Sequence, residues 1–258
     1  MTAPARRSRR PVLLIGGAAA LAVFVIGGLV VWFLSGDEPD EVSLDTATAQ
    51  VTTTPEDATT PEDATSPEDA TSPEGIDGVW SVDTSVGEFG YEESTGTFVG
   101  FRVGEELQGV GATEAVGRTP TVSGTLTIDG STISDVTVEA VMADLTTNDR
   151  RRDDRALGAL DTDEYPTATF VLTEPIELGS APSPGAAIDV EATGDLTIHG
   201  VTQSVVFPLE AQLADNTIVV VGSLDITFAD YGVEVPSAPI VVSADDHGPI
   251  ELQLFFTR

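Results

Sequence analysis

The sequence predicts an all-β domain of antiparallel strands, closed into a barrel or stacked as a sandwich, behind a membrane-spanning helix and a disordered linker. Three observations lead to this prediction. Apolar and polar residues alternate along most of residues 76–258, a charge-free run covers residues 11–34, and a short acidic repeat fills much of residues 35–75. Because a strand places successive side chains on opposite faces, alternation over many short runs is typical of a sheet with one dry face.

The charge-free run is long enough to cross a bilayer, since a helical span needs about 20 apolar residues. Four arginines precede it within residues 1–10, and positive charge stays on the cytoplasmic side. We therefore expect a cytoplasmic tail at 1–10, a signal anchor at 11–34 and an extracytoplasmic C-terminal domain, in a single-pass protein of the cell membrane. A cleaved signal peptide is the alternative, although its apolar core is usually shorter and "FLSGDEP" (33–39) is a poor cleavage site.

Residues 35–75 read as a disordered linker. The unit "TPEDAT" occurs at 54–59 and again at 60–65, and "SPEDAT" follows at 66–71. Such a segment cannot bury a core, while its prolines stiffen it and its like charges extend it. The simplest interpretation is a spacer that lifts the folded domain off the membrane. An O-glycosylated stalk remains open, because threonine and serine stand beside proline throughout.

The folded domain begins near Ile76. The clearest strands are 190–198 and 201–213, and the two residues between them, His199 and Gly200, form a hairpin turn in which glycine supplies a positive φ. Similar runs give roughly eight to ten strands in all. One dry and one wet face indicate antiparallel pairing. The wet faces carry Thr, Ser, Asp and Glu, which excludes a membrane-embedded barrel with an apolar outside.

Alternation alone does not distinguish a barrel from a sandwich. The dry faces mix large apolar residues with small ones such as Gly124, Ala192, Gly194 and Gly222. In a small barrel, small residues leave a lumen for one apolar ligand. In a sandwich, they let two sheets approach closely. The first arrangement implies a lipid-like ligand, and the second implies a structural or adhesive domain with a filled interior.

A family resemblance favours the barrel. "WSVD" at Trp80–Asp83, "RD" followed by "YPTATF" at 165–170, and "GDLTIHGVT" at 194–202 stand in the order and spacing of the YceI-like family. The chain from about Gly78 to Phe256 resembles this family over nearly the whole domain. The sequence departs from the family pattern at Ala229–Gly232, where many members carry an arginine before an aromatic-glycine pair, and within Phe98–Val103.

The resemblance implies a lipocalin-like antiparallel β-barrel with a short helical insert, holding a polyisoprenoid or another long-chain lipid in an apolar tunnel. The lipid, rather than a cofactor or a metal, is then the expected partner, and no enzymatic activity is expected. The residues expected to line the lumen are Phe101, Leu126, Ile128, Val138, Met142, Phe170, Leu172, Leu196, Ile198, Phe207, Leu224 and Ile226.

The basic cluster "NDRRRDDR" (148–155) stands out in a lysine-free chain with a net charge of −32. It predicts a helix from Arg150 to about Leu160, with Asn148 as its cap and Leu160 facing inward. The helix should end before Pro166, because proline disfavours helical geometry in the preceding residue. Interleaved aspartates favour local ion pairing. The alternative hypothesis for this cluster is that Arg152 and Arg155 contact a lipid headgroup, because guanidinium groups form strong hydrogen bonds with anionic groups.

The composition narrows the remaining classes. So acidic a chain repels nucleic acid. It has no cysteine and two histidines, which excludes thiolate metal sites and a multi-histidine centre. No nucleophile-elbow motif is present. The oligomeric state stays open at the level of sequence.

Overall fold

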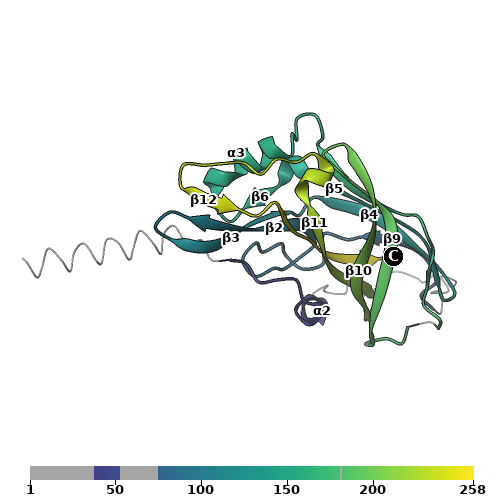
Figure 1. Ribbon diagram of the computed structural model, residues 1–258. Helices are drawn as coiled ribbons and strands as arrows, with labels where there is room; N and C mark the ends of the chain where they lie inside the picture. The colour runs from purple at the N-terminus through teal and green to yellow at the C-terminus, as the bar shows by residue number, and fades with distance from the viewer. Residues whose placement is uncertain (1–37, 53–74, 181) are drawn as a thin grey trace, which may run out of the picture.

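A computed structural model describes residues 38–52, 75–180 and 182–258 (Figure 1). The expected membrane span at 11–34 and the repeats at 54–71 lie outside these residues. Within the described ranges, no helix is both long and apolar enough to cross a membrane.

Eight antiparallel strands close into a barrel, in which each strand pairs with the next and the last pairs with the first. The sandwich alternative is therefore wrong. Closure comes from the pairing of the chain's final strand with the first strand of the domain, where Phe256 lies opposite Val82. In barrel order the strands are β1 (Gly78–Val82), β4 (Val122–Asp129), β5 (Thr132–Val141), β7 (Thr167–Leu172), β9 (Ala187–Ile198), β10 (Val201–Ala214), β11 (Thr217–Thr227) and β13 (His247–Thr257).

A second set of strands extends the barrel at one end. The first part of β13 pairs with β2 (Phe98–Leu107), which forms a hairpin with β3 (Gly111–Thr119). The short strands β12 (Val241–Ala244) and β6 (Thr146–Thr147) flank this hairpin, and β8 (Ile176–Glu177) pairs with β5. Helix α3 (Arg150–Ala159), β12 and the β2–β3 hairpin gather at the same end of the molecule (Figure 1). We call this the α3 end, and the opposite end, which holds the β10–β11 turn, the far end.

The β9–β10 turn confirms the hairpin predicted from sequence. Ile198 and Val201 pair across it. His199 has φ 52° and Gly200 has φ 73°. Two positive φ values in succession define the primed turn whose twist matches that of the strands.

The predicted helix forms, but its cap differs. Asp149, not Asn148, is the N-cap, and its carboxylate accepts a hydrogen bond from the backbone N–H of Arg151. Asn148 instead joins the helix to β3: its Nδ2 donates to the Glu114 carbonyl and its Oδ1 accepts from the Val116 N–H. Aspartate is favoured at the N-cap position because its negative charge also complements the partial positive charge of the helix N-terminus.

Residues 38–52 differ from the expected disordered linker. They form a strap that runs along the outside of the barrel and ends in helix α2 (Leu44–Thr52), which packs on β10 and β11 (Figure 1). Leu44 and Ala47 are buried there against Val219, Val221 and Phe255. The prediction of disorder was wrong for this part of residues 35–75, because the strap presents apolar residues at helical spacing to an apolar patch on the barrel wall.

A buried charge cluster holds the start of the strap. Glu251 on β13 accepts a hydrogen bond from Arg102 Nε at 2.7 Å and lies 3.5 Å from Arg118 Nη2. All three side chains are almost fully buried, although they point outward from the barrel. The Asp40 carbonyl accepts hydrogen bonds from both guanidinium groups and from the Ser94 hydroxyl. Charge-assisted bonds of this kind are among the stronger ones in proteins.

The two arginines of this cluster are not equivalent. Burial by itself lowers the pKa of Arg102, but the hydrogen bonds that its guanidinium donates to Glu114 and Glu251 outweigh this effect and leave the pKa above its ordinary value. Burial lowers the pKa of Arg118, and Glu251 only partly opposes this shift. Glu251 is therefore the carboxylate that compensates the buried charge of Arg118.

Candidate functional site

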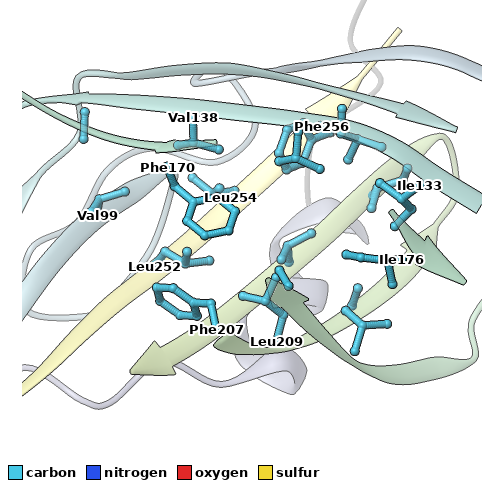
Figure 2. A pocket seen from close by; sticks show the side chains of 18 of the residues that line it. Val99, Ile133, Val138, Phe170, Ile176, Phe207, Leu209, Leu252, Leu254 and Phe256 are labelled. Atoms are coloured by element: carbon cyan, nitrogen blue, oxygen red, sulfur yellow. The ribbon is translucent and has the colours of Figure 1, made fainter. Parts of the chain in front are cut away.

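The barrel encloses an apolar lumen. Inward-facing side chains from strands around the barrel converge on one space, as Figure 2 shows for Val138, Phe170, Phe207, Leu252 and Phe256. Among the described residues that line it, only Thr169 and Gln212 carry polar side chains. Its volume is about 170 Å³.

Most of the predicted lumen residues lie on this wall. The residues found there are Phe101, Leu126, Ile128, Val138, Met142, Phe170, Leu196, Ile198 and Phe207. Ile226 lines a second cavity instead. Leu172 and Leu224 line neither cavity. Alternation predicts which face of a strand a residue lies on. It does not predict the position along the barrel, and that position decides whether an inward residue reaches the open space. Contact of these residues with a lipid stays a prediction.

Sequence reasoning missed other parts of the wall. Inward residues of β13, such as Leu252 and Leu254, show the same alternation and could have been chosen by it. By contrast, Leu178, Pro182 and Ala186 come from the connection between β8 and β9 and carry no periodic signal. They close the lumen at the far end.

Some small residues make room for neighbours rather than for a ligand. A Cβ on Gly194 would lie 2.5 Å from the Phe170 ring, and one on Gly222 would lie 2.5 Å from the Leu209 side chain. At these two positions, glycine lets a large side chain lie flat on the next strand. The lumen is therefore narrower than the count of small residues suggests.

A second cavity continues the lumen at the α3 end. Its volume is about 490 Å³. Its walls come from β2, α3, η2 (Phe228–Tyr231) and the segment 233–241. Four residues line both cavities and form the partition between them: Phe101, Leu160, Ile198 and Ile250.

Polar groups appear in the second cavity. Arg152 of α3 forms an ion pair with Glu105 of β2 on its wall. The Tyr231 side chain also lines it, and its hydroxyl is buried without a hydrogen-bond partner among the described residues. Burial raises the pKa of Tyr231. The hydroxyl therefore stays protonated and can donate a hydrogen bond.

The arginines of α3 combine both roles considered from sequence. Arg152 and Arg155 line the second cavity, as the headgroup hypothesis requires. Local pairing is present too, because Arg151 binds Asp149 at 2.7 Å and Arg155 donates to the Arg151 carbonyl. Arg152 is neutralised by Glu105, which leaves Arg155 as the cavity arginine without an ion-pair partner among the described residues.

Glu105 gives a pH-dependent prediction. Burial raises its pKa above the ordinary 4.5, and Arg152 offsets this only in part. The folded protein thus holds this proton to higher pH than the unfolded chain, so the stability associated with Glu105 falls as the pH rises through its folded pKa. The free energy of unfolding of the wild type, measured relative to that of Glu105→Gln, should therefore decrease as the pH rises from about 4 to about 7. Urea unfolding at both pH values measures this.

Glu106→Gln is the matched control, since Glu106 is the next residue and is exposed. The difference between wild type and this control should stay constant over the same range. A Glu105→Gln difference that is equally flat would contradict the assignment.

Other candidate chemistry finds little support. His199 packs against Tyr165 with ring centroids 5.0 Å apart, as a turn residue. The His247 side chain forms a hydrogen bond with the neighbouring Asp246 at 3.0 Å. Across the described ranges, no group of three or more acidic, histidine or cysteine side chains is arranged to hold a metal ion.

Comparison with known proteins agrees with this geometry. The model of the YceI-like domain matches residues 80–256. The chain belongs to the YceI-like family. A search of curated proteins returns no match.

A search of solved structures also finds proteins that are similar to this chain. One is a polyisoprenoid binding domain from Saccharophagus degradans, with 18% identity over 69% of this chain and 97% of that one, at a TM-score of 0.51. Another is BcnA of Burkholderia cenocepacia, with 23% identity, coverage of 61% and 95%, and a TM-score of 0.46. A Campylobacter jejuni YceI protein gives 19% identity, coverage of 54% and 82%, and a TM-score of 0.44.

Proposed function

We propose that this YceI-like protein holds a polyisoprenoid or a similar long apolar chain inside its barrel, outside the cell, while residues 11–34 tether it to the membrane. The observation that carries the proposal is an apolar lumen that opens past a thin partition into a larger cavity with polar groups. One end of the apolar chain fills the lumen. A longer chain extends into the second cavity, and its polar end then lies near Tyr231 and Arg155.

The geometry supports binding rather than catalysis. No histidine lines either cavity within the part of the chain that the structure describes. The lumen wall is almost wholly apolar, so it offers surface for burial and few groups for proton transfer. The same open lumen argues against a structural domain with a filled interior.

Extraction of the purified full-length protein tests the proposal. Organic solvent should release a long-chain lipid in near-stoichiometric amount, identified by mass spectrometry. A variant with its lumen filled, Ala192→Phe with Ala211→Phe, purified identically, controls for lipid that adheres to the outside. Equal amounts of lipid from both proteins, or none from either, would contradict the proposal.

The free hydroxyl of Tyr231 gives a sharper prediction about the polar end. A net hydrogen bond is worth about 0.5–1.5 kcal/mol, so Tyr231→Phe should weaken binding of a prenol by roughly 2- to 10-fold. Binding of the hydrocarbon of the same length, which lacks the hydroxyl, should not change. Titration of wild type and variant with this pair measures the effect. Equal losses for both ligands would mean that Tyr231 acts only through packing.

A further inference from the structure

The strap fixes where the chain enters the folded domain. Glu38 Oε1 accepts hydrogen bonds from the Glu114 N–H and the Thr113 hydroxyl, both at 3.0 Å. These residues lie near the start of β3, opposite Glu105 and Gly104 of β2. The same stretch of β2 pairs with β12 and, through Glu105, with α3. Residue 38 therefore lies at the α3 end, beside the second cavity.

The other end of the strap lies far from this point. Gln50 Oε1 accepts from the Gly96 N–H at 2.7 Å, just before β2 begins. Helix α2 packs near Ala214 and Val219, next to the β10–β11 turn. Gly75, where the described chain resumes, accepts from Arg258 at the end of β13. Residues 53–74 thus connect two points at the far end, and do not separate the domain from residue 38.

We propose that the α3 end of the barrel faces the membrane, and that the rim of the second cavity is the surface that contacts the bilayer. The inference rests on the tether of the proposed function. From Leu34, the end of the apolar run, to Glu38 is four residues, which span at most about 14 Å. The strap clamps Glu38 to the α3 end, so this end cannot lie far from the bilayer. The acidic repeat follows the strap in the chain, so on this inference it is not the spacer between membrane and barrel.

The chemistry of the rim suits a bilayer surface. Ile240, which lines the second cavity, is 49% exposed, and Val242, which follows the lining residue Val241 in β12, is 63% exposed. Arg150, Arg151 and Arg155 expose their side chains on α3 at the same rim. Apolar residues that enter the boundary of the acyl region, beside arginines that meet anionic headgroups, are typical of peripheral membrane contact.

This orientation lets a lipid move between bilayer and lumen without crossing water. The second cavity opens toward the membrane, and only the partition that includes Phe101 and Leu160 separates it from the lumen. A domain held on a long stalk would have to expose the apolar chain to solvent during each transfer. The cost of such exposure is about 0.8 kcal/mol per methylene.

Single cysteines test the orientation cleanly, because the chain has none of its own. Full-length Val242→Cys and Asn216→Cys proteins, each carrying a bimane label, are inserted in vesicles of phosphatidylcholine and phosphatidylglycerol that contain spin-labelled lipid. Both positions are exposed, and Asn216 lies in the β10–β11 turn at the far end. Quenching should be at least about threefold stronger at position 242. Equal quenching, or stronger quenching at 216, would overturn the orientation.

An inserted spacer tests the role of the strap. Twelve residues, "TPEDATTPEDAT", are placed between Gly36 and Asp37 in one protein and between Thr65 and Ser66 in another. The first insertion should reduce quenching at position 242 to the level at 216, while the second should leave it unchanged. If the repeat is the spacer between membrane and barrel, both insertions reduce quenching equally, and the inference is wrong.

Two controls separate this inference from the proposed function. Flotation with the vesicles shows that the chain inserts, and loss of flotation would overturn both the tether and the orientation. The lipid content of the same preparations is measured by mass spectrometry. Empty barrels with strong quenching at position 242 would contradict lipid carriage while supporting the orientation. Barrels that contain lipid, with equal quenching at positions 242 and 216, would support lipid carriage while contradicting the orientation.

Discussion

Filling the lumen with two aromatic rings, in the variant Ala192→Phe with Ala211→Phe, should reduce affinity for a long apolar chain by at least about tenfold. Both alanines line the lumen, on neighbouring strands β9 and β10. The rings would occupy space that the chain needs. Each methylene kept out of the lumen loses about 0.8 kcal/mol, so exclusion of two or three methylenes accounts for a tenfold loss or more. Titration with a fluorescent polyprenyl analogue measures it.

Ala187→Phe is the matched control for this experiment. It places the same ring on β9 at an exposed position, and binding should stay at the wild-type level. Overpacking costs about 1–3 kcal/mol, so urea unfolding must show that the double variant still folds. A folded double variant with unchanged affinity would mean that the chain does not bind in the lumen.

Alternation in the sequence predicted the strands, the β9–β10 turn and the inward faces, because these depend on residues close together in the chain. It could not predict closure. Whether the strands form a barrel depends on β13 pairing with β1, as Phe256 does with Val82. The alternation of apolar and polar residues within each strand does not predict that pairing. The family resemblance was therefore needed to choose between a barrel and a sandwich.

The strap shows a different limit. Leu44, Ala47 and Val51 follow helical spacing, so a signal was present in the sequence. The acidic, threonine-rich composition of the surrounding segment obscured it. The patch that receives the helix cannot be found from sequence, because Val219, Val221 and Phe255 stand on outward faces. The role of an apolar residue on an outward face becomes clear only when the segment that packs on it is known.

The buried charge cluster was missed for the same reason. Arg102 and Glu251 alternate with inward apolar residues, and a charged residue on an outward face is ordinarily exposed. Here the strap and the 83–97 connection cover that face, with Arg118 donating to the Tyr91 carbonyl and to Ser94 Oγ. Burial therefore follows from long-range contacts that the strand pattern does not contain.

Glu251→Gln should destabilise the domain by about 3–5 kcal/mol, the usual cost of removing one partner from a buried ion pair. The substitution keeps the shape of the side chain but removes the negative charge beside two buried guanidinium groups. Arg102 retains Glu114 at 2.7 Å. Arg118 retains carbonyl and hydroxyl acceptors and two aromatic rings, with its guanidinium carbon 4.3 Å from the Phe98 ring and 5.8 Å from the Tyr91 ring. Urea unfolding of wild type and variant measures the loss.

Glu114→Gln is the control, since it removes a carboxylate from the same Arg102 at a position where the side chain is 32% exposed. Water reaches the Glu114 carboxylate and Arg102 keeps Glu251 as a partner, so the effect of this substitution should be smaller than that of Glu251→Gln. If the large loss comes from an uncompensated charge on Arg118, adding Arg118→Met to Glu251→Gln should restore part of the stability, because it removes the orphaned cation. Further loss in the double variant would instead show that Arg118 stabilises the strap through its bond to the Asp40 carbonyl, independently of Glu251.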